Sequence, residues 1–193
     1  MRIGVLGFQG AVREHIRSLS RLNVESRVVK RMEDLETIDG LVLPGGESTT
    51  ISLLAHGAFL DRLREMVRCG VPMFGTCAGM ILLAKDVDGR ATPYLGAIDI
   101  GVRRNASGRQ VDSFEAELAV EGIGRFPAVF IRAPYITRMG PEVTPLARYE
   151  GIVVMAREKN VLVSSFHPEL TEDVRIHRRF IEMVEQNEQG KEN

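Results

Sequence analysis

Residues 71–84 read VPMFGTCAGMILLA and contain the pattern that decides the fold. The apolar run Val71–Phe74 is typical of a buried strand, and Met80–Ala84 has a helical pattern. Between them lies Gly75-Thr-Cys-Ala-Gly79, in which a glycine stands two residues before and two residues after Cys77. Small neighbours permit a sharp strand–turn–helix connection, the nucleophile elbow, and the helix start behind it stabilises a thiolate. The stretch therefore predicts an α/β protein with a candidate nucleophile at the end of a buried strand.

Strand and helix patterns alternate on both sides of this stretch through the first half of the chain. Short apolar runs typical of strands are followed by longer segments of helical period. The expected strands are Ile3–Leu6, Val28–Val29, Leu41–Leu43 and Met73–Phe74, and the expected helices are Val12–Leu22, Ile51–Leu54 with Phe59–Val67, and Met80–Ala84. This alternation predicts a three-layer α/β sandwich, in which helices cover both faces of a mostly parallel central sheet.

The second half of the chain has a different rhythm. From Ile98 to Ser165, strand-like segments follow one another, with turn residues at 105–108, 122–124, 140–141 and 158–160. An antiparallel or mixed extension of the sheet is the simplest interpretation. Apolar residues at helical spacing in Asp173–Gln186 then predict a closing amphipathic helix. We expect a single domain over residues 1–186 and a polar C-terminal tail over residues 187–193.

The composition narrows the class of protein. Among 193 residues, 25 Lys and Arg stand against 26 Asp and Glu, and the net charge of -1 argues against a general nucleic-acid binder. The longest uncharged stretch, Cys69–Ala84, is interrupted by glycines and shorter than the ~18 apolar residues of a membrane span, so we expect a cytoplasmic protein. Two cysteines are too few for a disulfide scaffold or a four-thiolate metal site, and no metal is expected.

A nucleophilic thiol needs a base, and His167 has the most suggestive setting among the four histidines. It follows the apolar strand Val161–Phe166 and precedes Pro168 and Glu169. Proline biases the preceding residue toward extended geometry, so the side chains of His167 and Glu169 can lie on the same side. The carboxylate can then orient the imidazole and stabilise its charged form.

The other histidines have ordinary structural explanations. His15 and His177 lie in helical segments rich in Arg and Glu and are expected to be solvent-exposed, whereas His56 precedes Gly57 and is expected to cap a helix end. Cys69 precedes the turn at Gly70 and is assigned a structural role.

A third candidate is the loop Pro44-Gly-Gly-Glu-Ser-Thr-Thr50, which follows a predicted strand. Consecutive glycines allow backbone N–H groups to converge on a developing oxyanion, and a helix start after Ser48 adds donors for a substrate carboxylate. Each of the three candidates also has a structural interpretation: a small buried cysteine, a surface turn at residues 167–169, or a simple strand-to-helix turn after Leu43.

Together these segments resemble the class I (triad) glutamine amidotransferases, and within them the glutaminase subunits of pyridoxal 5'-phosphate synthase, the PdxT family. The resemblance implies a flavodoxin-like class I glutamine amidotransferase fold and extends from Ile3 to about Val184. The motifs that carry it are GVLGFQGAVREH at Gly4–His15, LPGGESTT at Leu43–Thr50, RNASGRQVDSFE at Arg104–Glu115, FIRAP at Phe130–Pro134 and FHPELT at Phe166–Thr171.

The resemblance also implies roles for individual residues. Cys77 corresponds to the nucleophile, with His167 and Glu169 as the rest of the triad. The residues that correspond to glutamine-binding positions are Gly46, Glu47, Ser48, Arg104, Ile131 and Arg132, and the backbone N–H groups of Gly46 and Ala78 correspond to the oxyanion hole.

The implied reaction is hydrolysis of L-glutamine to L-glutamate and ammonia through a cysteine thioester, with no metal or organic cofactor. Ammonia would pass to a separate synthase subunit of the PdxS type, held in a hetero-oligomer, that makes pyridoxal 5'-phosphate (vitamin B6). Two alternatives stay open. The histidine-biosynthetic glutaminase also carries a Phe-His-Pro-Glu ending, but Gly4–His15 and Arg104–Glu115 favour the vitamin B6 family. A catalytically silent subunit is disfavoured by the intact Cys77, His167 and Glu169.

Overall fold

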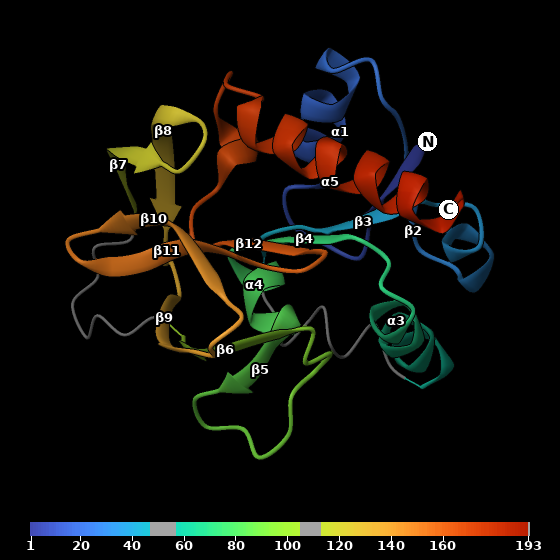
Figure 1. Ribbon diagram of the computed structural model, residues 1–193, viewed down its shortest axis with the longest axis horizontal. Helices are drawn as coiled ribbons and strands as arrows, with labels where there is room; N and C mark the ends of the chain where they lie inside the picture. The colour runs from blue at the N-terminus through green and yellow to red at the C-terminus, as the bar shows by residue number, and fades with distance from the viewer. Residues whose placement is uncertain (47–56, 105–112, 193) are drawn as a thin grey trace.

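The computed structural model describes residues 1–46, 57–104 and 113–192. Within these residues, nine strands form one sheet in the order β2-β1-β3-β4-β12-β11-β10-β7-β8 (Figure 1). Its first half contains β1 (Arg2–Leu6), β2 (Glu25–Val29), β3 (Gly40–Leu43), β4 (Met73–Thr76) and β12 (Val161–Ser164). These five strands pair in parallel, which confirms the mostly parallel central sheet that the alternating pattern predicts.

Helices cover both faces of this parallel half and make the three layers. On one face lie α1 (Val12–Arg21) and α5 (Arg175–Glu192), and on the other lie α3 (Ala58–Arg68) and α4 (Ala78–Leu83) (Figure 1). The residues of β3 alternate between the two cores, because successive side chains of a strand point to opposite faces. Leu41 and Leu43 belong to the α3/α4 core, whereas Val42 belongs to the α1/α5 core.

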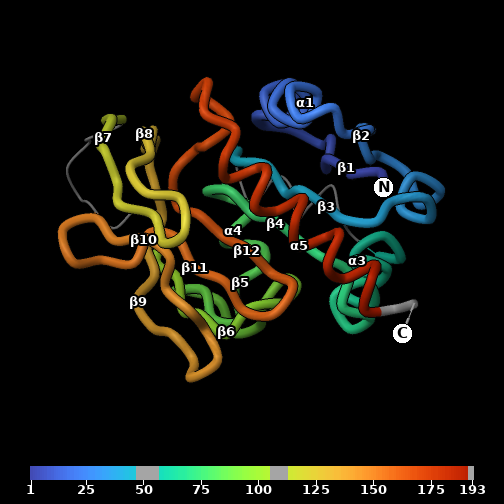
Figure 2. The backbone as a smooth tube through the Cα atoms, turned by 45° about the horizontal axis from the view of Figure 1, so that its top comes forward, coloured from blue at the N-terminus to red at the C-terminus, as the bar shows by residue number. Residues whose placement is uncertain are grey.

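The second half of the large sheet is antiparallel. Its strands are β7 (Ser113–Val120), β8 (Gly124–Ile131), β10 (Thr144–Tyr149) and β11 (Ile152–Glu158). They pair as two hairpins, and β11 joins them to β12. Figure 2 shows both hairpins at the opposite end of the molecule from β2.

Two of the segments expected to extend the sheet form a separate small sheet instead, together with a third strand that lies before Ile98 and was not predicted. In the order β5-β6-β9, these are β5 (Ala84–Val87), β6 (Ile98–Arg103) and β9 (Tyr135–Met139). Their apolar side chains, among them Ile98, Ile100 and Ile136, contribute to the core on the α3/α4 face. A strand pattern predicts that a segment is extended and half-buried but does not specify its partner strand, so the prediction that the large sheet continues was wrong for β6 and β9.

The closing helix is longer than the predicted Asp173–Gln186, since α5 continues to Glu192. Glu, Gln and Lys, which dominate its last turns, are good helix formers. The described residues also contain two short 3-10 helices, η1 (Met32–Leu35) and η2 (Pro168–Leu170). The predicted helix at Ile51–Leu54, the cap at His56 and the turn at 105–108 lie outside the described residues. Within the part of the chain that is described, no helix is long and apolar enough to cross a membrane.

Candidate active site

Cys77 occupies the sharp turn between β4 and α4, as the sequence predicts. Its backbone lies in the left-handed region, with φ 49° and ψ -104°, a conformation that is strained for a non-glycine residue. The turn also requires its glycine neighbours, because a Cβ at Gly79 would lie 1.9 Å from the carbonyl oxygen of Leu43, and one at Gly75 would lie 2.6 Å from the backbone of Gly79. The Cys77 thiol donates to the carbonyl of Ile131 over 3.8 Å.

His167 and Glu169 come together through η2, which begins directly after His167. Pro168 occupies the first position of this 3-10 turn, where its missing N–H is not needed. The turn brings Glu169 back against the ring, so that His167 Nδ1–H donates to Glu169 Oε1 over 2.8 Å. Both side chains are almost fully buried.

Burial and charge act in opposite directions on this pair. Burial lowers the pKa of His167, but its hydrogen bonds to Cys77 and Glu169 outweigh that effect and raise the pKa from 6.5 to about 10. Burial raises the pKa of Glu169, whereas His15 and His167 hold it well below its usual range. The pair is therefore a carboxylate beside an imidazolium. A charged His167 favours the thiolate form of the neighbouring cysteine, which is the nucleophilic form.

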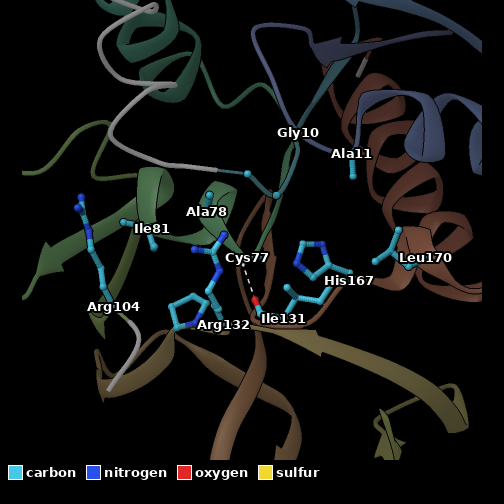
Figure 3. A pocket seen from close by; sticks show the side chains of 13 residues that line it. Gly10, Ala11, Cys77, Ala78, Ile81, Arg104, Ile131, Arg132, His167 and Leu170 are labelled. Carbon is cyan, nitrogen blue, oxygen red and sulfur yellow. Dashed lines mark hydrogen bonds between the residues drawn. The ribbon is translucent and has the colours of Figure 1, made fainter. Parts of the chain in front are cut away.

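A cavity of about 580 Å³ opens over Cys77. Figure 3 shows Arg104 and Leu170 at opposite sides of this cavity, with Cys77, Arg132 and His167 between them. Its lining contains most of the predicted site residues, namely Gly46, Cys77, Ala78, Arg104, Ile131, Arg132 and His167. Glu169 does not line the cavity but accepts a hydrogen bond from the His167 ring. Glu47 and Ser48, predicted to bind glutamine, lie outside the described residues.

The loop after β3 forms one wall of this cavity. The Gly45 N–H donates to Thr76 Oγ1 over 3.0 Å, and the Gly45 carbonyl accepts from Ala11 N–H over 3.3 Å. Since its N–H is engaged, Gly45 cannot serve as an oxyanion donor. Gly46 and Ala78 are the candidates, and Ala78, as the first residue of α4, has an N–H without an intrahelical acceptor.

The prediction that His15 and His177 are solvent-exposed was wrong, because both are fully buried. Their charged neighbours occupy other faces of α1 and α5. His15 stands four residues before the buried Leu19, and His177 stands three residues before the buried Phe180, which are helical spacings for one face. That spacing is the signal that sequence reasoning missed. Thr76, also fully buried, carried no sequence signal at all.

The fold is that of a glutamine amidotransferase. At the carboxyl edge of the parallel sheet, the strained Cys77 shares a cavity with His167, which is hydrogen-bonded to Glu169. The chain belongs to the SNO glutamine amidotransferase family, whose sequence profile matches residues 5–186. It is an enzyme of the glutamine amidotransferase class, which confirms the class that the sequence motifs indicate.

Relatives of known name agree with this family. The chain is 55% identical to the pyridoxal 5'-phosphate synthase subunit PdxT of Carboxydothermus hydrogenoformans, over 95% of this chain and 98% of the relative. It is 53% identical to the protein of the same name from Geobacillus sp. (strain WCH70), over 96% of this chain and 98% of the relative. These names confirm the predicted resemblance to the PdxT family.

Solved structures give the same fold. A crystal structure of a glutamine amidotransferase superposes with a TM-score of 0.90 at 50% identity, covering 94% of this chain and 98% of the other. A putative GMP synthase subunit from Thermoplasma acidophilum, 20% identical, superposes with a TM-score of 0.73 over 100% of this chain and 98% of the other; at that identity it supports the fold alone.

Proposed function

We propose that this chain hydrolyses L-glutamine to L-glutamate and ammonia, with Cys77 as nucleophile, His167 as general base and acid, and Glu169 as the group that orients His167. One observation carries the proposal. The Nδ1–H of His167 is held by Glu169 at 2.8 Å, which leaves Nε2 as the ring nitrogen available to the Cys77 thiol on the strained elbow. This is the nucleophile, base and orienter relationship of a catalytic triad.

The reaction follows from these positions. The proton of the Cys77 thiol resides on His167, the imidazolium described above, and the thiolate of Cys77 attacks the side-chain amide carbon of glutamine. The N–H groups of Gly46 and Ala78 stabilise the oxyanion, a contribution of about 3 kcal/mol per donor in comparable sites. His167 then protonates the departing ammonia, which leaves a γ-glutamyl thioester. Water, deprotonated by His167, attacks the thioester and releases glutamate. No step requires a metal or an organic cofactor.

The substrate is proposed to lie in the cavity over Cys77, with its α-carboxylate toward the arginines. Arg104 and Arg132 line the cavity together with Ile131, and a guanidinium can bind a carboxylate through two parallel hydrogen bonds. The guanidinium of Arg104 donates to the hydroxyl of Tyr94 over 2.5 Å. This hydrogen bond restricts the positions that the guanidinium can take in the cavity. By resemblance, Glu47 and Ser48 complete the glutamine site.

We further propose that the ammonia is used by a separate synthase subunit of the PdxS type, in a cytoplasmic hetero-oligomer that makes pyridoxal 5'-phosphate. Relatives at 53–55% identity carry the name of a subunit of that synthase. The test is to mix the chain with a synthase subunit from such a relative and to measure pyridoxal 5'-phosphate formation from a pentose phosphate, a triose phosphate and glutamine. Product with ammonium salts but not with glutamine would contradict this pairing.

The glutaminase activity itself is tested by ammonia release from glutamine, with and without that subunit. A glutamine-like chloroketone should inactivate the enzyme, and peptide mass spectrometry should place the adduct on Cys77. Cys69 is an internal control, because it is exposed at the end of α3 and does not line the cavity over Cys77. Modification confined to Cys69 would overturn the assignment of the nucleophile.

A further inference from the structure

Behind the triad lies a buried group of polar side chains that the proposed reaction does not use directly. The polar cluster consists of His15 on α1, Thr76 on β4, Glu169 on η2 and His177 on α5. His15, Thr76 and His177 are fully buried, and Glu169 is 4% exposed. Four elements far apart in the sequence thus place hydrogen-bonding groups at one point beneath the active site. Such groups are costly to bury unless they satisfy one another.

The Thr76 hydroxyl is the centre of the polar cluster. It accepts the N–H of Gly45 over 3.0 Å and donates to Glu169 Oε1 over 3.4 Å. His15 Nε2 lies 3.2 Å from Thr76 Oγ1. A hydroxyl has one proton and two lone pairs. With its proton on Glu169 and one lone pair on Gly45, the remaining lone pair requires a donor, so His15 carries its proton on Nε2.

This tautomer determines the next one. His15 Nδ1 lies 3.0 Å from His177 Nε2, and one proton lies between the two nitrogens; His177 supplies it when the His15 ring is neutral. Burial is the main cause that lowers the pKa of His177 to about 3, so His177 is neutral and carries a single ring proton. His177 Nδ1, which has no partner among the described residues, is left as an unpaired acceptor. The reverse tautomer would leave a buried N–H unpaired, and orphaned N–H groups are rarer than orphaned acceptors.

In this arrangement each group of the polar cluster donates its proton to the next one, from His177 through His15 and Thr76 to the carboxylate of Glu169. Its Oε1 receives the proton of Thr76 and that of His167, and His15 Nε2 lies 3.5 Å from it. Its Oε2 has no partner within the described part of the chain. The hydrogen bonds that orient the carboxylate are thus all made to Oε1. Without the donors behind it, His167 alone would hold the carboxylate in place.

We propose that His15, supported by His177, is a positioning residue for the triad: through Thr76 it fixes both the carboxylate that orients His167 and the Gly45 peptide beside the oxyanion donors. The proposal rests on the proposed glutaminase function. It assigns one role to a histidine 61 positions from Thr76 and 162 positions from His177 in the chain. Ala11, the residue before α1, also holds this loop, since its N–H donates to the carbonyl of the next peptide group, that of Gly45.

Two substitutions of His15 separate positioning from packing. Leucine fills a similar space without a donor, whereas the amide of glutamine can present an N–H where Nε2 lies. We expect His15→Leu to lower kcat by roughly ten- to hundredfold with little change in KM, because misplacement by about 1 Å costs rates of that order. His15→Gln should recover most of that loss. Ser18→Ala, which removes a buried hydroxyl group from the same helix, is the matched control and should keep the wild-type kcat.

Ring-nitrogen NMR of the ¹⁵N-histidine-labelled full chain tests the proton arrangement without any turnover. We expect Nε2–H tautomers at His15 and His177, and no titration of His177 at neutral pH. An Nδ1–H tautomer at His15, or a His177 that titrates near its usual value, would overturn the proposal. Equal kcat in His15→Leu and His15→Gln, whether low or unchanged, would overturn it as well. If the wild type releases no ammonia, the proposed function fails, and the NMR result still decides the arrangement of the polar cluster.

Discussion

Replacing Gly45 with alanine tests how closely the loop after β3 encloses the ring of His167. The backbone of Gly45 does not require glycine, because its φ is not among the positive values. The obstacle is space: a Cβ at this position would lie 2.3 Å from Cε1 and 2.8 Å from Nδ1 of His167. Ordinary contact begins at 3.4 Å, so the ring edge must retreat by about 1.1 Å or the loop must move by the same amount.

The magnitude follows from that displacement. Misplacement of a catalytic group by about 1 Å costs about a hundredfold in rate, which corresponds to about 2.7 kcal/mol of activation free energy. Overpacking of a buried site should also lower the free energy of unfolding by about 1–3 kcal/mol. We therefore expect Gly45→Ala to fold with a reduced Tm and to lose most of its kcat, with a smaller change in KM.

The assay is the initial rate of ammonia release against glutamine concentration, measured beside thermal unfolding. Gly190→Ala on α5 is the matched control, because a Cβ there would meet nothing within 4 Å and alanine favours helix. It should keep the wild-type kcat. A Gly45→Ala enzyme with wild-type kcat, and with His167 unmoved in its crystal structure, would refute the reasoning.

Further expectations concern the triad and Gly10, which lies in the loop between β1 and α1. Cys77→Ser and His167→Asn should each abolish ammonia release without unfolding the chain, and circular dichroism with thermal melts checks the fold. Glu169→Gln should retain more activity than His167→Asn, since an orienting group is not the proton carrier; equal losses in two folded variants would contradict the separate roles. Because the pKa of His167 is raised from 6.5 to about 10, its charged form stabilises the fold fully below about pH 6.5. That contribution is lost as pH rises toward 10, so the Tm difference between wild type and His167→Asn should shrink over this window; a constant difference would argue against it. Gly10→Val should impair turnover more than glutamine binding, because a Cβ at Gly10 would lie 1.6 Å from the Gly45 carbonyl oxygen; unchanged kcat would show that this contact does not matter.

The sequence alone was sufficient where the requirement is local. An elbow around Cys77 needs small residues two positions before and after it, and those glycines can be read directly. The pairing of His167 with Glu169 is similarly short-range, since a proline between them sets the turn that joins them. Alternating apolar runs likewise predicted the parallel sheet and its two covered faces, because the period of burial follows from the period of the backbone.

The tertiary structure alone decided which distant residues share an environment. The helical spacing of His15 with Leu19 and of His177 with Phe180 indicated the buried face of each helix, but only the packing of α1 and α5 against the sheet brought the two histidines together. The separate β5-β6-β9 sheet depended in the same way on partners that a strand pattern does not name. A sequence displays local conformational preference directly, whereas hydrogen bonds between residues as far apart as 162 positions exist only after the chain has closed around them.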